Sequence, residues 1–284
     1  MAASSGYDFK AKRVSGTTTP VDHHLGGIVT NATPEMRVDY DEQAATGQYQ
    51  LAVQQTVAIY PRLRLEMKLQ RLANFIADKD GTYKFCFVSA EGALSVYNLY
   101  VSDGIDADKW TTCLTDRCEV TIPIRGSIEA SIDVLAKTAT AQAYGSAPGA
   151  ISDAILNHTN VNTLSIGETS IKTDFLNFRF SVSHNIQQEV LGTTLTPTEV
   201  LQRETKYSGT IRRALKTQSF KADAYAGTPR DIILQINDNQ TTPVKTKLTW
   251  ADAYFGESKV VRGLDMIIEE IPWRAKGLTI EAGS

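Results

Sequence analysis

The stretch Glu119–Val134, EVTIPIRGSIEASIDV, alternates between apolar and polar residues along its whole length. Even positions are apolar or glycine, and odd positions are polar apart from Pro123. Because successive side chains of a β-strand point to opposite faces, this period of two predicts a ribbon with one apolar and one polar face. The stretch is far longer than the five or six residues of a typical strand. Pro123 and Gly126 therefore favour a bent strand, or a hairpin folded near Arg125-Gly126.

Length and composition indicate a folded protein. The chain has 284 residues, of which 42% are hydrophobic and 21% charged, enough for one large β domain or two of medium size. A net charge of −3 argues against a clamp on nucleic acid, which needs an excess of Lys and Arg. No apolar run approaches the roughly 20 residues of a membrane helix. Because MAASSGYDFKAKR lacks an apolar core for export, we expect a protein made in the cytoplasm, without membrane contact.

The three cysteines, Cys86, Cys113 and Cys118, are an odd number in a chain without an export signal. This favours reduced thiols over a Cys113–Cys118 disulfide. Two cysteines separated by four residues, with no second pair, are also a poor zinc signal.

Further strands and two short helical segments follow from the same patterns. Leu72, Phe75 and Ile76 have helical spacing, and residues 220–225 favour a second helical turn. Pro61 is expected to divide two strands, and residues 83–101 to form a hairpin. The other predicted strands cover residues 47–60, 63–70, 178–182, 202–215, 231–236, 244–250, 264–271 and 277–282.

The order of these patterns predicts two similar β units. Residues 1–34 are rich in Gly, Ser and Thr and predict an extended N-terminal arm. Residues 35–138 form the first predicted unit and residues 166–284 the second. Between them, residues 139–165 have the small, polar composition of a linker. The fold class is therefore mainly β, with sandwich or barrel units whose similar order suggests a duplication.

No motif for catalysis, a cofactor or a structural metal is found in the sequence. His23-His24 falls in the predicted arm, and His184 is interpreted as a histidine at a turn that bonds to backbone. Glu269 and Glu270 are adjacent, so on a strand they would point to opposite faces and could not share a substrate. We therefore predict that the protein is not an enzyme and uses no cofactor.

The segment FRFSVSHNIQQEVLGTTLTPTEVLQRETKYSGTIRRAL, from Phe178, resembles the second half of major tail tube proteins of long-tailed bacteriophages. The shared features are Asn185-Ile186, Pro197 and the aromatic-x-Gly step Tyr207-Ser208-Gly209. The region before the linker is similar too, with Cys118, Gly126 and a closing DVLAK. The C-terminal KLTWADAYFG and LDMIIEEIPWRAKGLTIEA end like the final β unit of that family. The resemblance covers about residues 40–284.

This resemblance implies a structural virion protein that stacks as rings into a hollow tube for the phage genome. Rings of this family are built from six single-domain subunits or three two-domain subunits, and the possible duplication favours three. Two alternatives stay open at this stage. One is a monomeric β-sandwich binding module of the adhesin or carbohydrate-binding type, and the other is a tube protein of the type VI secretion kind.

The resemblance also implies roles for the ribbon. Its acidic residues Glu119, Glu129 and Asp133 share one face, and are candidate lumen residues that would repel DNA phosphates. The apolar residues are candidate subunit contacts, with neighbouring copies completing the ribbon: Val120, Ile122, Ile128 and Ile132. The implied partners are other copies of the chain, tape measure, tail terminator and distal tail proteins, and genomic DNA passing without specific binding. The implied location is the virion tail.

Overall fold

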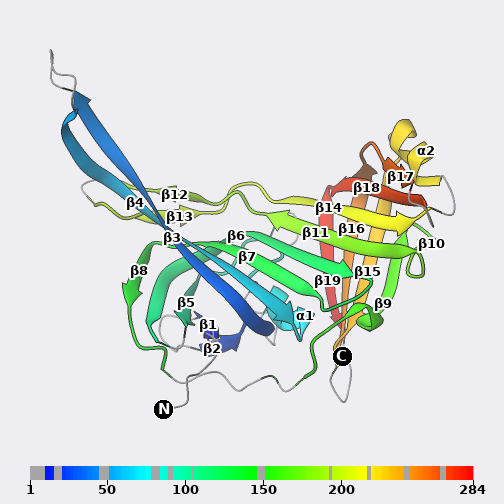
Figure 1. Cartoon of the computed structure of the whole chain (residues 1–284), viewed down its shortest axis with the longest axis horizontal. Helices are drawn as coiled ribbons and strands as arrows, with labels where there is room; N and C mark the ends of the chain where they lie inside the picture. Colours follow the sequence, from blue (N-terminus) through cyan, green and yellow to red (C-terminus); the bar gives the residue numbers. More distant parts are fainter. Residues whose placement is uncertain are drawn as a thin grey trace.

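The structure is mainly β, with two short helices and a strongly curled antiparallel half-barrel sheet at its centre (Figure 1). It is a computed structural model that describes residues 10–283 with eleven gaps. These gaps are residues 16–20, 45–50, 78–83, 89–91, 104, 146–150, 152, 192–193, 216–218, 240–243 and 263–266.

The half-barrel, which we call the central sheet, crosses the whole molecule. Every neighbouring pair of its strands is antiparallel. From one edge to the other the strands are β3 (Gly27–Ala44), β4 (Leu51–Leu69), β7 (Glu129–Leu135), β6 (Ala107–Pro123), β11 (Phe175–Ser183), β14 (Lys206–Ala214), β18 (Ile267–Ala275) and β17 (Lys259–Arg262).

Two smaller sheets flank the central sheet. The first contains β2 (Val21–His24), β1 (Lys10–Ser15), β5 (Tyr97–Ser102), the start of β6 and β8 (Thr138–Ala141). The second contains β10 (Thr169–Ser170), β9 (Val161–Ile166), β15 (Arg230–Asn237), β16 (Lys245–Phe255) and β19 (Gly277–Gly283). The remaining elements are α1 (Leu72–Ile76), a 3-10 turn (His158–Asn160), α2 (Ser219–Ala226) and the hairpin of β12 (Gln187–Glu189) and β13 (Glu199–Leu201).

The ribbon predicted from the sequence is a hairpin. It consists of the end of β6, a turn that includes Gly126 with φ of +102°, and β7. The expectation that neighbouring copies complete this ribbon is wrong. The outer edge of β6 pairs with β11, and that of β7 pairs with β4, so both edges are filled within one chain.

Two expectations for the first third of the chain are also wrong. Within the predicted arm, the described residues 10–15 and 21–34 are not a separate segment, because β1 pairs with β2 and β5, and β3 begins at Gly27. Pro61 does not divide two strands, since β4 runs through it. Pro61 precedes Arg62, where pairing with β7 begins, so its missing N–H leaves the β7 ladder intact.

The predicted helices are confirmed, and the predicted hairpin over residues 83–101 is not. Leu72, Phe75 and Ile76 are all buried on α1, and α2 covers residues 220–225. In the described part of residues 83–101 only β5 is a strand, and Lys84 forms a single bridge with Ala77. Phe85 and Phe87 are instead buried in the core as irregular backbone.

The pairing pattern of residues 10–141 recurs in residues 161–283, and we call these two segments the first and second repeats. In the central sheet, the order β3-β4-β7-β6 of the first repeat matches β11-β14-β18-β17 of the second. A short helix follows β4, and another follows β14. In the flanking sheets, β2-β1-β5-β6-β8 matches β10-β9-β15-β16-β19. The long strand β6 thus corresponds to β16 and β17 together.

Irregular features recur at matching positions as well. The register shift between Val29 and Asn31 on β3 matches the shift between Phe175 and Asn177 on β11. Thr112 on β6 has φ of 52°, and Asp252 on β16 has φ of 50°. A left-handed conformation is uncommon outside glycine, so its recurrence supports a common local structure.

At one buried position pair, an apolar pair in the first repeat corresponds to an ion pair in the second. In the first repeat Met67 on β4 lies opposite Ala130 on β7. In the second repeat the corresponding residues are Arg213 and Glu269, which are both buried and form an ion pair with Nη2–Oε2 and Nε–Oε2 distances of 2.7 and 2.9 Å. The ring of Phe220 on α2 lies 4.4 Å from the Arg213 guanidinium, so the pair connects this helix to the sheet.

Replacing Ile132 with Asp tests the orientation of the ribbon. Ile132 is fully buried, so we expect Ile132→Asp to lower the free energy of unfolding by about 4 kcal/mol or more, and Ile128→Asp to do the same. The matched control is Ile124→Asp in the turn, where 39% of the residue is exposed and the loss should stay below about 1 kcal/mol. Urea unfolding measures both. Equal effects at Ile132 and Ile124 would contradict the assignment of the faces.

Removing one member of the buried ion pair should be more harmful than removing both. We expect Glu269→Ala to lower the free energy of unfolding by about 3–5 kcal/mol, since it leaves the Arg213 charge buried without its carboxylate. The double variant Arg213→Met, Glu269→Ala installs the residues of the first repeat and should recover most of that loss. Thermal and urea unfolding compare the variants. A double variant that loses the sum of the two single effects would contradict this explanation.

Candidate functional site

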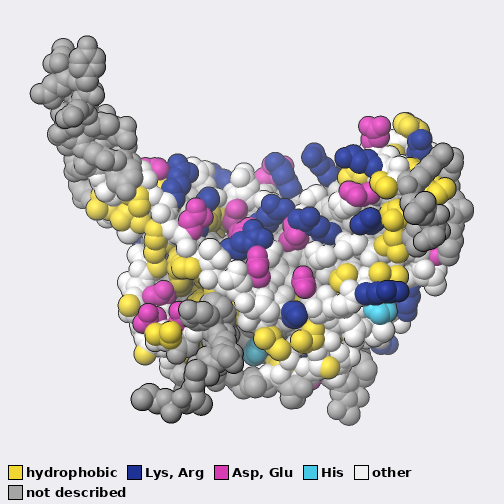
Figure 2. Space-filling model, in the orientation of Figure 1, with side chains coloured by type: hydrophobic (Ala, Val, Ile, Leu, Met, Phe, Trp, Pro, Cys, Tyr) yellow, Lys and Arg dark blue, Asp and Glu magenta, His cyan; other side chains and the backbone are white. Residues whose placement is uncertain are grey.

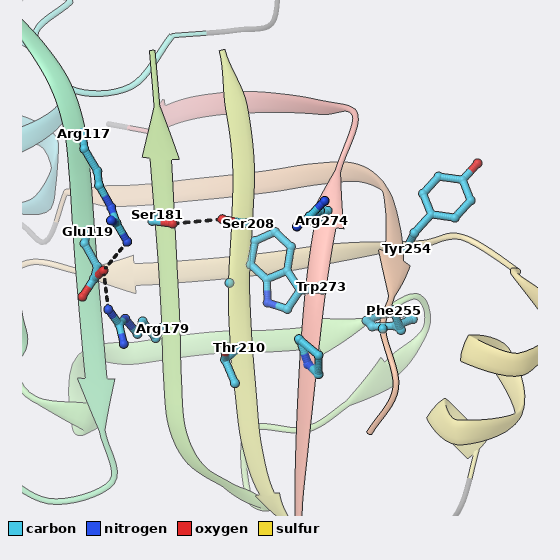
Figure 3. Close-up of a pocket in the computed structure, with 13 residues that line it drawn as sticks. Arg117, Glu119, Arg179, Ser181, Ser208, Thr210, Tyr254, Phe255, Trp273 and Arg274 are labelled. Carbon is cyan, nitrogen blue, oxygen red and sulfur yellow. Dashed lines mark hydrogen bonds and ion pairs between the residues drawn. The ribbon is translucent and has the colours of Figure 1, made fainter. Parts of the chain in front are cut away.

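One face of the central sheet is polar and exposed. Along β4, β6, β7, β11, β14 and β18, side chains alternate between this face and the buried core. Two depressions, of about 620 and 310 Å³, lie on the polar face. The larger spans β6, β11, β14 and β18 (Figure 3), and the smaller lies over β4, β7 and β6. The polar face is therefore the concave side of the curled sheet.

Glu119 lies at the middle of this face, where the two repeats meet. Its Oε2 is 2.6 Å from Arg179 Nη2 on β11 and 3.3 Å from Arg117 Nη2 on its own strand (Figure 3). On the next two strands, the hydroxyls of Ser181 and Ser208 are hydrogen-bonded at 3.0 Å. A line of polar contacts thus crosses the junction between β6, β11 and β14.

Basic side chains outnumber acidic ones on the polar face of these six strands. Figure 2 shows the two kinds intermingled. The basic residues are Arg62, Arg64, Lys68, Arg117, Arg179, Lys206, Arg212 and Arg274, and the acidic residues are Glu66, Glu119, Glu129, Asp133 and Glu270. On this face the acidic side chains therefore lie among a larger number of basic ones, a pattern that we call a charge mosaic.

The three predicted lumen acids share this face, each beside basic groups. Glu119 is bound as described above, and Glu129 lies opposite Lys68 on β4. Asp133 lies opposite Arg64 on one side and Arg117 on the other. Burial raises the pKa of Asp133 above its ordinary value, while the two guanidinium groups act in the opposite direction.

The four apolar ribbon residues do not lie on a surface. Val120, Ile122, Ile128 and Ile132 are fully buried and belong to the core of the chain. In this fold their side chains pack against other parts of the same chain, so they are not available for contact with a neighbour.

The strand edges of the central sheet are a feature that the sequence patterns did not single out. Among the described residues, β3 pairs only with β4, and β17 pairs only with β18. Exposed apolar side chains gather on these two strands: Ile28 and Met36 on β3, and Val260 and Val261 on β17, with 42–54% of each residue exposed. An edge strand that presents unpaired backbone groups and apolar side chains is a site for pairing with another chain.

The aromatic-x-Gly step noted in the sequence has a packing role. A Cβ at Gly209 would lie 2.5 Å from the Trp273 ring and 2.3 Å from the Arg179 carbonyl oxygen, so only glycine fits. Trp273 then packs against Trp250 and Phe178, with ring centroids 5.3 and 6.2 Å apart. These aromatic rings are buried, unlike the clustered surface aromatics of a carbohydrate-binding module.

The remaining candidates for chemistry have structural roles. His184 is buried, and its Nε2 donates to the Cys86 carbonyl at 2.8 Å, as expected for a histidine that bonds to backbone. Cys86, Cys113 and Cys118 are free thiols, as predicted, and all three are buried. Glu269 and Glu270 point to opposite faces, also as predicted.

The described residues contain neither a cluster that could hold a metal ion nor a helix that could span a membrane. In the described part of the chain, no group of three or more His, Cys, Asp or Glu side chains could hold a metal ion. None of the helices among these residues is long and apolar enough to cross a membrane.

A half-barrel with a polar concave face and two open edges defines a structural subunit that assembles with copies of itself. The family model for phage tail tube proteins matches residues 9–275, and the chain belongs to this family. It is a structural subunit of the tail tube, a component of the virion tail, and its family is not enzymatic. No protein with a curated description matches the chain.

Proposed function

We propose that three copies of the chain close into a ring, and that stacked rings form the tail tube. The observation that carries this proposal is the recurrence of one pairing pattern in the two repeats. Each repeat is then equivalent to one single-domain subunit, as in an internal duplication, so three chains supply six equivalent positions. The sequence-based boundaries of these units, 35–138 and 166–284, fall within or close to the two repeats and are part of this proposal.

In this ring the concave polar face of the central sheet lines the lumen. The opposite face of the sheet is apolar and buried, so it is not available to line a water-filled channel. Glu119, Glu129 and Asp133 are then lumen residues, but among neighbouring Arg and Lys side chains. Genomic DNA passes over a face on which acidic side chains partly neutralise a larger number of basic ones, and whose remaining charge is screened by salt beyond about 10 Å.

The hairpin of β3 and β4 supplies the contact between stacked rings. It projects well beyond the body of the molecule (Figure 1), and its outer part makes no sheet contact with β7, whose pairing with β4 ends at Arg62. A projecting hairpin of this length is suited to reach the next ring. The ends of the tube then meet the tail terminator and distal tail proteins, and the lumen encloses the tape measure protein before DNA passes.

Chemical labelling of a single cysteine tests which face lines the lumen. Ser181→Cys lies on the polar face, and the three native cysteines are buried and should not react. In the monomer we expect both a small maleimide and a maleimide attached to a large polyethylene glycol to react. In assembled tubes only the small reagent should react at a comparable rate, with the large reagent slowed at least tenfold, because it cannot enter the bore.

Thr169→Cys is the matched control, since Thr169 is exposed in the second flanking sheet, away from the polar face. It should react with both reagents in the tube. Rapid labelling of Ser181→Cys in intact tubes by the large reagent would contradict the assignment of the lumen face.

A further inference from the structure

We propose that the ring closes when β17 of one subunit pairs antiparallel with β3 of the next, in the register that β6 adopts with β11 inside each chain. This inference rests on the proposed ring and names its contact residue by residue. Each chain contains one complete junction between repeats, in which β6 of the first meets β11 of the second. In a closed ring the second repeat of one chain must meet the first repeat of the next. The internal junction is therefore a template for the junction between subunits.

The internal junction has a definite register. Across it, Glu119 lies opposite Ser181, and Arg117 lies opposite Ser183. To apply this register to the pairing of β17 with β3, the residue of β17 that corresponds to each β6 residue, and the residue of β3 that corresponds to each β11 residue, must be known. Those equivalents follow from the pairing of each strand with its inner neighbour, which is independent of the junction itself.

The equivalents on β3 follow from its pairing with β4. In the first repeat, Leu65 on β4 lies opposite Ile132 on β7. In the second repeat, Ile211 on β14 lies opposite Ile271 at the matching position of β18. Leu65 and Ile211 are therefore equivalent. Ala32 lies opposite Leu65, and Phe178 lies opposite Ile211, which makes this pair equivalent too.

The matching register shifts on β3 and β11, one position before Asn31 and Asn177, confirm this alignment. Counting along the two strands, Glu35 on β3 is equivalent to Ser181 on β11. By the same count, Arg37 is equivalent to Ser183.

The equivalents on the other edge follow from β7 and β18. Glu119 lies opposite Ser131 on β7, and Lys259 lies opposite Glu270 at the matching position on β18. Lys259 is therefore equivalent to Glu119, and Glu257, two residues earlier, is equivalent to Arg117. Thr112 and Asp252 both have positive φ, and each lies seven residues before Glu119 and Lys259, respectively, which supports the same alignment.

Transfer of the register places Lys259 opposite Glu35 of the next subunit and Glu257 opposite Arg37. Both pairs have opposite charge, although charge played no part in deriving them. All four residues are exposed in the single chain. Directly opposite charges stabilise antiparallel strands, and the open backbone groups of both edges gain hydrogen bonds in the same step.

The same charges disfavour a register that is shifted by two residues. Sliding the strands by two residues would place Lys259 opposite Arg37 and Glu257 opposite Asp39, which are two like-charge pairs. The exposed apolar residues of the two edges also lie at this contact between β17 and β3, which we call the seam. Met36 falls opposite Ser258, and Val260 falls opposite Pro34, so apolar surface that is open in the single chain becomes covered.

Charge reversal tests this seam in cells that co-express the chain with the other tail genes. We expect Lys259→Glu or Glu35→Lys alone to reduce the assembled fraction at least tenfold, and the double variant to restore it. Lys172→Glu, an exposed lysine away from both edges, is the matched control and should assemble normally. Sedimentation and negative-stain electron microscopy measure assembly, and thermal unfolding of the monomers checks that each variant folds.

A cysteine pair tests the register directly while leaving the four charges in place. Met36→Cys combined with Ser258→Cys puts the two residues directly opposite, within the roughly 4.4–6.8 Å between Cα atoms that a disulfide requires. Oxidation of assembled tubes should convert most of the chains to covalently closed trimers. Met36→Cys with Val260→Cys is diagonal and lies near or beyond that limit, so its yield should be at least fivefold lower.

The outcomes separate the two proposals. If the wild-type chain forms no rings or tubes with the other tail proteins, the proposed function fails and the seam fails with it. If tubes form, but Lys259→Glu assembles normally or the diagonal cysteine pair cross-links as well as the opposite pair, the seam is wrong and the tube function stands. Restoration by the double charge reversal together with selective cross-linking supports the seam.

Discussion

Unpaired backbone N–H and C=O groups at the two ends of the central sheet are the constraint on which the rest of the structure depends. Each inner strand of this sheet has hydrogen-bonded neighbours on both sides within the chain, whereas β3 and β17 each have one among the residues that the structure describes. Soluble proteins usually blunt such edges, because they template aggregation. A subunit that closes a ring instead needs both edges open and complementary. In the proposed ring, the curl of the sheet favours closure over an open fibre.

The repeat explains how a single chain can carry two complementary edges. The junction of β6 with β11 shows that the end of one repeat fits the start of the next, because the two are already paired in that way. Because the two repeats are parts of one chain, their side chains can differ from each other. The second repeat has a buried Arg213–Glu269 pair where the first has Met67 and Ala130, and each repeat has its own outer charges. Such differences let the internal junction and the outer edges hold distinct charge patterns while the backbone pairing stays the same.

Sequence patterns predicted most of this fold, since local periodicity reports which residues face the core. The alternation over residues 119–134 predicted a β ribbon that is either bent or folded into a hairpin, and the structure has the hairpin of β6 and β7. The spacing of Leu72, Phe75 and Ile76 predicted α1. The patterns failed where long-range pairing decides the outcome. Apolar ribbon residues such as Ile128 could not be divided between core and subunit contact, because both require an apolar face. Nor could the excess of Arg and Lys around Glu119 be foreseen, since those residues come from strands distant in sequence. The described part of the predicted arm was misjudged because β1 is short and its partner β5 is remote in sequence.

The most direct test of the account is the symmetry of the assembled tube in end-on cryo-electron microscopy views. Two similar repeats per chain and three chains per ring predict a ring that looks nearly six-fold at low resolution and is strictly three-fold once side chains are resolved. The two kinds of junction should then alternate around the lumen, with the polar face of the central sheet innermost. Six copies of the chain in one ring, or a ring whose lumen is lined by the flanking sheets, would contradict it.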